Sequence, residues 1–242
     1  MNYDNQYRPG PFGHLPVVTK NIIIINVIMF AATFLLESPG VNLMRFFGLH
    51  YYLAPDFKPH QFITYIFMHA GFTHIFFNMF GVYIFGQVLE QVWGPKRYLI
   101  FYLLTGLGAA LAQYIIMSFE INSTLSAINE QINSGGLTVE DQSYLINYKT
   151  DYLNSNIIVG ASGSLFGLLG GFGMLFPNRE LYLYFFIPVK AKWLVIVYGA
   201  LEIFAGIQNN PGDKVAHFAH IGGLLVGVVL VLIWRRDRRH FY

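Results

Sequence analysis

The segment "IIVGASGSLFGLLGGFGML", residues 157–175, is apolar enough for a membrane span, yet it contains six glycines and two serines, Ser162 and Ser164. Glycine weakens a helix by roughly 1 kcal/mol per residue relative to alanine, so its abundance here requires a reason. Because glycine has no side chain, two membrane helices that carry it can approach until their backbones nearly touch. The segment therefore predicts a membrane helix that packs closely against a partner and places a hydroxyl near the contact.

The composition of the chain is that of a membrane protein. Of its 242 residues, 55% are hydrophobic and 12% are charged, whereas charged residues make up roughly a quarter of a soluble domain. There is no cysteine, which excludes disulfides and thiolate metal sites. We expect an all-α integral membrane protein, one bundle of six transmembrane helices over residues 17–235. The six apolar runs long enough to cross a bilayer are 17–36, 72–90, 97–119, 157–176, 191–208 and 215–234.

The connections between these runs differ in length and polarity. Residues 62–89 are too many for one straight span, so we expect 62–70 to form an interfacial loop and Thr73 to be the N-cap of the second span. Residues 120–156 are polar and net acidic, and they predict a long external loop or a short helical excursion. The "NNPGDK" segment, residues 209–214, is rich in helix-breaking residues and predicts a short external turn.

The distribution of Lys and Arg predicts the orientation. An even number of spans puts both termini on one side, and that side would hold eleven of the 15 Lys and Arg residues. Positive charge is in excess on the cytoplasmic side of membrane proteins. We therefore expect residues 1–16 and the basic tail 236–242 to be cytoplasmic. The first run is not followed by a small-residue cleavage site, so we expect no removable signal peptide.

Two polar side chains within the spans predict a functional site, because polar groups are costly inside a membrane. Ser162 and His220 each lie about five residues from the external end of their runs, which places both roughly 8 Å below that surface. Glycine ridges would bring the two helices together. These ridges are Gly163, Gly167 and Gly171 on one run and Gly223 and Gly227 on the other.

A histidine within hydrogen-bond reach can take the proton of a serine and make it a nucleophile. Ser162 and His220 are expected to form such a pair, whereas Ser164 points about 200° around the helix and His217 lies one turn nearer the surface. The alternative is that Ser162 bonds a carbonyl of its own helix and that His220 is only a packing residue.

A third cluster, "MHAGFTHIFFNMF" at residues 68–80, contains His69, His74 and Asn78. His74 and Asn78 are four residues apart and share a helix face. Donors aimed at one point beside a serine are what an oxyanion needs. A metal site is the alternative, but the five-residue spacing of His69 and His74 does not put two ligands on one helix face.

These motifs resemble those of the rhomboid intramembrane serine proteases. "GASG" (160–163) is similar to the G-x-S-G nucleophile motif of the family, and "AHIGGLLVG" (219–227) is similar to its A-H-x-x-G-x-x-x-G motif. "HAGFTHIFFN" (69–78) is similar to its H-x-x-x-x-H-x-x-x-N segment. All three occur in the family's order on the second, fourth and sixth runs. The resemblance covers roughly residues 17–235.

The resemblance implies that Ser162 is the nucleophile and His220 the general base of a dyad that has no acidic third member. It implies that His74, Asn78 and the backbone N–H of Ser162 stabilise the oxyanion, that Glu90 is structural, and that no cofactor or metal takes part. The substrates would be transmembrane segments of other membrane proteins, cut near the external face. The structural candidates are His69, Gly163, Phe166, Gly223, Gly227 and Glu90.

Two positions depart from the family pattern. His60-Gln61 stands where the family often has Trp-Arg in the first external loop, so the resemblance leaves the anchoring of that loop open. Phe166 stands where a tyrosine often stacks on the histidine, a change that keeps the stacking and loses the hydroxyl. Glu202 lies within two turns of the external end of the fifth run. It is either hydrogen-bonded near the interface or part of a gate.

Three function classes remain in view. We expect an intramembrane serine endopeptidase with transmembrane protein substrates, and a multi-pass location in the plasma (inner) membrane of a bacterium. The first alternative is an inactive relative that binds membrane clients, but such relatives usually lack the serine or the histidine. The second is a small transporter, which would need charged groups along a path through the midplane. No nucleic-acid partner is expected, and the oligomeric state is left open.

Overall fold

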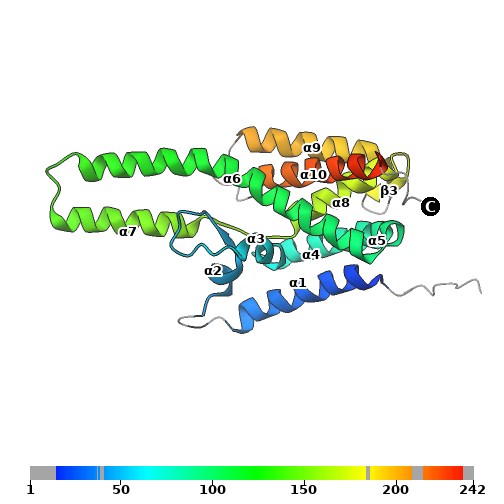
Figure 1. Ribbon diagram of the computed structural model, residues 1–242, viewed down its shortest axis with the longest axis horizontal. Coiled ribbons are helices and arrows are strands. Elements are labelled where there is room, and N and C mark those ends of the chain that lie inside the picture. Colours follow the sequence, from blue (N-terminus) through cyan, green and yellow to red (C-terminus); the bar gives the residue numbers. More distant parts are fainter. Residues whose placement is uncertain (1–14, 37, 39–40, 184–185, 209–214, 237–242) are drawn as a thin grey trace, which may run out of the picture.

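The computed structural model describes residues 15–236 except 37, 39–40, 184–185 and 209–214 (Figure 1). Five of the described helices are long and apolar enough to cross a membrane, and a sixth, α8, is apolar but shorter. The predicted all-α bundle is confirmed. Residues 1–14 of the expected cytoplasmic segment, the turn at 209–214 and the tail from 237 on lie outside the described residues. The bundle consists of α1 (Val17–Leu35), α4 (Phe72–Gly81) continuing into α5 (Gln87–Trp93), α6 (Pro95–Asn133), α8 (Ser162–Leu175), α9 (Ala191–Gln208) and α10 (His217–Arg236).

The first described helix is fixed at its start by a carboxylate from the second span. Glu90 in α5 accepts hydrogen bonds from the backbone N–H of Val18 at 2.9 Å and of Thr19 at 2.7 Å, and from the Thr19 hydroxyl at 2.7 Å. The first N–H groups of a helix have no partner within the helix and carry positive partial charge. The buried Glu90 therefore joins α1 to α5 through a capping interaction.

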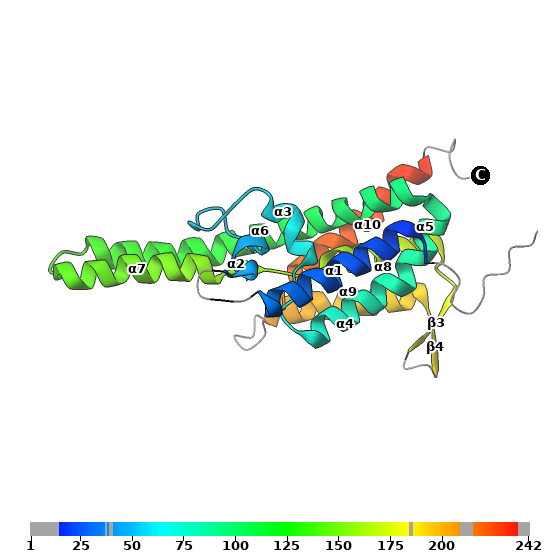
Figure 2. The ribbon, with the colours of Figure 1, turned by 90° about the horizontal axis from the view of Figure 1, so that it is seen from below.

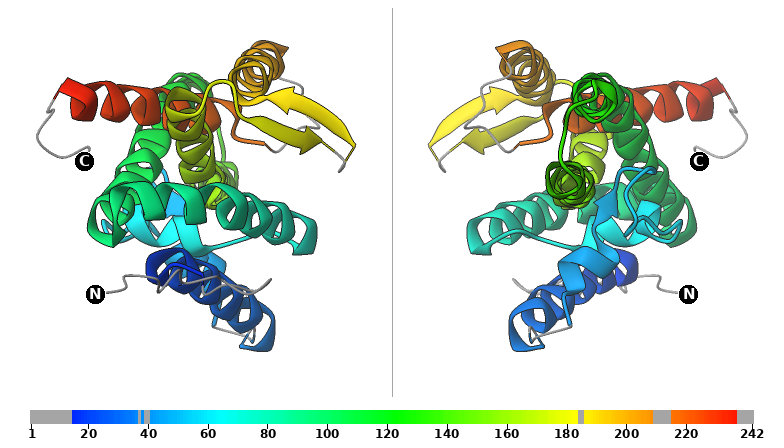
Figure 3. Two further views of the ribbon diagram at one scale, coloured as in Figure 1. Left: turned by 90° about the vertical axis from the view of Figure 1, so that its right-hand side faces the viewer. Right: turned by 90° about the vertical axis from the view of Figure 1, so that its left-hand side faces the viewer.

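Helix α8 lies in the middle of the bundle, with α6 and α10 against it (Figure 3). Nine of its 14 residues are buried. A Cβ atom on Gly223 of α10 would lie 1.9 Å from the carbonyl oxygen of Gly163, and one on Gly227 would lie 2.6 Å from that of Gly167. The two helices thus approach as closely as the glycines predict.

The glycine ridge of α8 faces α6, so the prediction that it faces the helix of His220 is wrong. A Cβ atom on Gly163 would lie 2.3 Å from Ala109, one on Gly167 2.4 Å from Thr105, and one on Gly171 2.9 Å from the ring of Phe101, all in α6. Helix α10 instead meets the carbonyl oxygens of Gly163 and Gly167 through its own glycines. Gly170 is the α8 glycine whose Cβ would point at α10, 3.1 Å from the carbonyl oxygen of Leu224.

The segment 120–156, predicted as an external loop or a short excursion, is a long helical hairpin. Helix α6 continues unbroken to Asn133, and α7 (Val139–Ser155) returns beside it (Figure 1). At 39 residues α6 is about 58 Å long, nearly twice the roughly 30 Å hydrocarbon core. The loop prediction was wrong because the polar composition concealed a buried stripe at helical spacing, formed by Ile121, Leu125 and Ile128.

The predicted fourth span begins later than expected. Ile157–Ile158 forms strand β2, which pairs antiparallel with β1 (Leu49–His50), and α8 begins at Ser162. Gly160 has φ of 126°, a left-handed conformation that glycine adopts and that a helix cannot contain. Ser162 is therefore the first residue of α8, not the fifth or sixth of a span.

The short α8 gives another reason for a site below the membrane surface. Its 14 residues span about 21 Å, roughly 9 Å less than the hydrocarbon core. If its Leu175 end reaches one face, Ser162 lies below the other. We call the end of the bundle that holds Ser162 and the α6–α7 hairpin the hairpin end; the start of α1 and the end of α10 lie at the opposite end (Figure 1).

Short elements complete both ends of the bundle. The predicted loop 62–70 is partly helical, with α3 (Gln61–Thr64) followed by a 3-10 turn (Tyr65–Phe67). Helix α4 begins at Phe72 with Gly71 as N-cap, so the prediction for Thr73 was wrong. The other short elements are α2 (Leu43–Phe47), a π-helical turn (Val82–Gly86) between α4 and α5, and the β3 (Glu180–Leu183) and β4 (Ile187–Lys190) ribbon, which projects at the opposite end (Figure 2).

Candidate active site

Ser162 and His220 meet where α8 and α10 begin. The Nε2 atom of His220 lies 2.8 Å from the Oγ atom of Ser162, a normal hydrogen-bond distance. His220 is buried and is the fourth residue of α10, and Gly223 follows it by one turn at the closest approach to α8. The backbone contact of the two helices therefore fixes how far apart these two side chains can be.

The imidazole of His220 is also fixed in its plane. The ring of Phe166, one turn after Ser162 in α8, stacks on it with centroids 4.3 Å apart and planes 6° apart. Offset stacking of this kind restricts rotation of the smaller ring. The expected stacking is present, and it aims Nε2 at Ser162.

Ser164 and His217, the polar neighbours of Ser162 and His220 in the sequence, make contacts of their own with other residues. Ser164, fully buried, donates its hydroxyl to the backbone carbonyl of Tyr102 in α6 at 2.9 Å. His217 places Nδ1 2.6 Å from Oε2 of Glu202 in α9. Of the two serines in "GASGS", it is Ser162 that contacts His220.

His74 lies against the segment that leads into α8. A Cβ atom on Gly160 would lie 2.7 Å from the His74 ring, so this glycine leaves the space that the ring occupies. Asn78 is buried one turn further along α4, and its Nδ2 donates to the His74 carbonyl at 2.9 Å. Gly81, three residues beyond Asn78, faces Leu165 of α8. This face of α4 is therefore turned toward α8.

His69 supports His74 from outside the span. The two rings meet edge to face with centroids 5.0 Å apart, and His69 is 1% exposed. Burial, with a smaller contribution from repulsion by His74, lowers the pKa of His69 to about 3. Neither ring nitrogen of His69 has a hydrogen-bond partner among the described residues. The ring is thus a neutral packing group at neutral pH.

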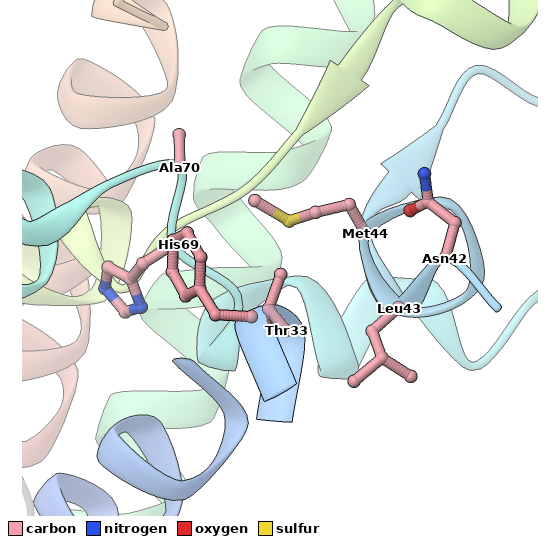
Figure 4. A pocket seen from close by; sticks show the side chains of 7 residues that line it. Thr33, Asn42, Leu43, Met44, His69 and Ala70 are labelled. Carbon is pink, nitrogen blue, oxygen red and sulfur yellow. The ribbon is translucent and has the colours of Figure 1, made fainter. Parts of the chain in front are cut away.

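A pocket of about 190 Å³, with His69 in its lining, lies between the end of α1 and the start of α2 (Figure 4). It is lined by Thr33, Phe34, Asn42, Leu43, Met44, His69 and Ala70. Neither Ser162 nor His220 lines it, so this pocket is separate from the Ser162–His220 contact.

Gln61 anchors the loop whose fixation the sequence left open. Its Oε1 accepts from the backbone N–H of His50 and of Lys58, both at 3.2 Å, and its Nε2 donates to the carbonyl of Asp56 at 3.0 Å. His60 places Nε2 3.0 Å from the Phe46 carbonyl. The buried amide of Gln61 thus forms hydrogen bonds to three separate positions of the loop backbone.

Glu202 is the site residue whose place the sequence did not predict. Its Oε2 atom lies 2.9 Å from Nδ1 of His220 and 2.6 Å from Nδ1 of His217. The side chains of all three are largely buried, with 10% to 15% of their surface exposed. The only sequence signal was an intramembrane carboxylate near the depth of His220, which names no partner.

A partly buried contact between a serine and a histidine, inside a bundle of membrane-spanning helices, defines the class: an integral membrane protein with a serine hydroxyl beside an imidazole. A family model of the Rhomboid domain matches residues 56–237, and the chain belongs to this family. RHOMBOID-like protein 6, mitochondrial, of Arabidopsis thaliana is 31% identical over 172 residues, which are 71% of this chain and 42% of that protein. The putative rhomboid protease YdcA of Bacillus subtilis is 26% identical over 181 residues, 74% of this chain and 69% of that protein.

Rhomboid-like protein 11, chloroplastic, of Arabidopsis thaliana is 25% identical over 217 residues, 87% of this chain and 62% of that protein. The chain spans less than two thirds of the length of both plant relatives. Two of these three relatives are named as mitochondrial and chloroplastic proteins, and the third comes from a bacterium. The similarity therefore does not select the membrane, and the bacterial plasma membrane stays a prediction.

Proposed function

We propose that this protein is an intramembrane serine endopeptidase that hydrolyses peptide bonds in transmembrane segments of other membrane proteins. The observation that carries the proposal is the 2.8 Å contact between Ser162 Oγ and His220 Nε2 in a chain of the rhomboid family. A serine within reach of an imidazole nitrogen has a base for its proton, which a serine bonded to its own helix lacks.

In the proposed reaction, Oγ of Ser162 attacks the scissile carbonyl carbon while its proton passes to Nε2 of His220. The tetrahedral intermediate collapses as His220 returns that proton to the leaving amine, which leaves an acyl-enzyme on Ser162. Water then attacks the ester, with His220 again as general base. The Phe166 stack and the glycine contact keep the base in place through both steps.

We propose that His74, Asn78 and the backbone N–H of Ser162 stabilise the oxyanion. As the first residue of α8, Ser162 carries an N–H group that the helix itself does not satisfy, and the helix dipole favours negative charge there. The His74 ring lies beside Gly160, two residues before Ser162. Asn78 has a second amide hydrogen beyond the one that it donates to the His74 carbonyl.

The position of the site supports a substrate that is embedded in the membrane. Ser162 begins a helix too short to cross the hydrocarbon core, so a substrate is cut below the membrane surface at the hairpin end. A scissile bond there must leave the helical conformation, because a helical carbonyl is shielded and hydrogen-bonded. Segments with helix-weakening residues near that face are therefore the expected substrates, and the bilayer is the second partner.

We propose that the hairpin end faces away from the cytoplasm. Of the described residues, Lys20, Arg97, Arg179, Lys192 and Arg235 belong to the ends of spans or connections opposite the hairpin end, and positive charge favours the cytoplasmic side. A protease-accessible tag inserted after Ser134 supports this orientation. An accessible C-terminal tag in sealed cells contradicts it.

The test is cleavage of a membrane-embedded reporter by purified protein in micelles. Ser162→Ala is expected to abolish cleavage, and Ser164→Ala, which loses only the bond to Tyr102, is the matched control that retains it. His220→Ala is expected to abolish cleavage as well, whereas His217→Ala keeps substantial activity. Cleavage by Ser162→Ala protein that is free of contaminating protease overturns the proposal. Failure of the wild-type protein to cut any reporter or take any serine-directed label would favour a client-binding protein.

A further inference from the structure

The carboxylate of Glu202 completes a row of polar atoms that begins at the serine. Ser162 Oγ lies 2.8 Å from Nε2 of His220, and Nδ1 on the other side of the same ring lies 2.9 Å from Oε2 of Glu202. The three residues come from α8, α10 and α9, so only the folded bundle brings them together. This order of groups, hydroxyl, imidazole and carboxylate, is the order of a serine protease triad.

We propose that Glu202 is a positioning residue for His220, an inference that rests on the proposed function. For Nε2 to accept the serine proton, the other ring nitrogen, Nδ1, must carry the hydrogen of the neutral ring. A carboxylate beside Nδ1 favours this tautomer. When the proton moves from Oγ to Nε2, the ring becomes an imidazolium, and the negative charge 2.9 Å away stabilises it. Glu202 stays deprotonated throughout, so the proton balance is that of the two-residue reaction.

The contact acts mainly through charge. Although Nδ1 and Oε2 are close, their alignment is not that of a hydrogen bond. The Phe166 stack fixes the plane of the ring, so the ring cannot turn to improve the angle without losing that stack or the contact to Ser162. A charge interaction depends less on alignment than a hydrogen bond does.

His217 has a part in holding the carboxylate. Its Nδ1 lies 2.6 Å from the same Oε2 atom, and it precedes His220 by three residues on the same helix. The carboxylate therefore lies between two rings of α10. A Glu202 side chain held in this way loses less rotational freedom when it acts on His220 than a free one would.

A metal ion is the other use for this cluster, since Glu202, His217 and His220 could offer three ligand atoms within 4.8 Å of one another. Ligands of a tetrahedral zinc ion with metal–ligand distances of about 2.0–2.1 Å are roughly 3.3 Å apart. The separations of 2.6 Å and 2.9 Å are shorter and suit direct contact between a carboxylate and the two imidazole nitrogens. The geometry thus favours the positioning role over a metal site.

The experiment measures kcat and KM separately for the Glu202→Gln and Glu202→Asp variants. The midpoint of thermal unfolding of each variant is measured in the same micelles. Glu202→Gln removes the charge and keeps the shape, so kcat is expected to fall roughly 10- to 100-fold with KM changed less than about two-fold. Glu202→Asp keeps the charge and is expected to recover part of the loss. Leu201→Ala, an exposed neighbour on α9, is the matched control with unchanged kcat.

A double-mutant cycle keeps the inference falsifiable if Glu202→Gln proves poorly folded. His217→Gln is expected to lower kcat a few-fold in the wild-type background, by less in the Glu202→Asp background, where the shorter side chain draws the carboxylate away from His217, and not at all in the Glu202→Gln background, because it acts through the carboxylate. Full kcat in Glu202→Gln, independent effects in the cycle, or loss of wild-type activity on addition of a chelator would each overturn the positioning role. If Ser162→Ala still cleaves, the proposed function itself fails; if only Glu202→Gln is fully active, this inference alone fails.

Discussion

Replacing Gly223 with alanine tests whether the backbone contact of α8 and α10 sets the distance between Ser162 and His220. The new Cβ atom would lie 1.9 Å from the carbonyl oxygen of Gly163, whereas ordinary contact begins at 3.4 Å. Because the obstructing atom belongs to the backbone, rotation of a side chain cannot relieve the clash. The two helices must separate locally by about 1.5 Å.

This separation acts directly on the Ser–His contact. Gly163 follows Ser162 in sequence, and Gly223 lies one turn beyond His220, so the 2.8 Å distance is expected to grow to about 4 Å. A misplacement of about 1 Å can lower turnover by 10²-fold. Overpacking of a close contact costs about 1–3 kcal/mol of stability. We therefore expect Gly223→Ala to lose about 100-fold in kcat while the folded protein remains detectable.

The assay compares three alanine substitutions in reporter cleavage and in unfolding from micelles. In Gly227→Ala the Cβ would lie 2.6 Å from the Gly167 carbonyl oxygen, a milder clash one turn further from the dyad, so a smaller loss of kcat is expected. In Gly199→Ala it would lie 3.2 Å from the flexible end of the Leu224 side chain, and kcat should not change. A Gly223→Ala protein with wild-type kcat and stability would refute the reasoning.

Three further substitutions test individual contacts. Asn78→Ala is expected to lower kcat roughly 10- to 1,000-fold with little change in stability, measured by steady-state cleavage; full activity would remove Asn78 from the oxyanion site. Glu90→Gln places an amide beside the donors Val18 and Thr19 and is expected to cost about 1–3 kcal/mol in unfolding experiments; an unchanged stability would contradict the capping role. His69 has a folded pKa of about 3, below the unfolded value, so the unfolded state binds the extra proton and stability falls as pH drops below about 6.5. Between pH 7.5 and 5 this single group accounts for about 2 kcal/mol, and His69→Gln should lose that part of the pH dependence; an equal pH dependence in both proteins would show that His69 is solvated.

The sequence was sufficient to predict positions where the evidence lay in spacing along one helix. The six apolar runs correspond to the helices of the bundle, and the opposite directions of Ser162 and Ser164 follow from helix geometry alone. Gly223 and Gly227 could be named as contact residues because close approach in a membrane depends on the absence of side chains. The direction of the ridge formed by Gly163, Gly167 and Gly171 was wrong, because spacing along one helix does not tell which neighbour that face meets; it meets α6.

Features that depend on tertiary contact could not be predicted in the same way. The late start of α8 arises from the pairing of Ile157–Ile158 with Leu49–His50, residues more than a hundred positions apart. The α6–α7 hairpin has a narrow buried stripe within a polar composition, so a reading by hydropathy alone takes it for a loop. Glu202 was visible as a buried charge, but its contacts to two histidines depend on how α9 packs against α10.

The most direct test of the central claim is the site of covalent modification by a fluorophosphonate, which reacts with an activated serine. Peptide mapping of the labelled protein is expected to find one adduct, on Ser162, and His220→Ala is expected to abolish it while His217→Ala does not. Labelling at another serine, or labelling of Ser162 at the wild-type rate in His220→Ala, would contradict the account.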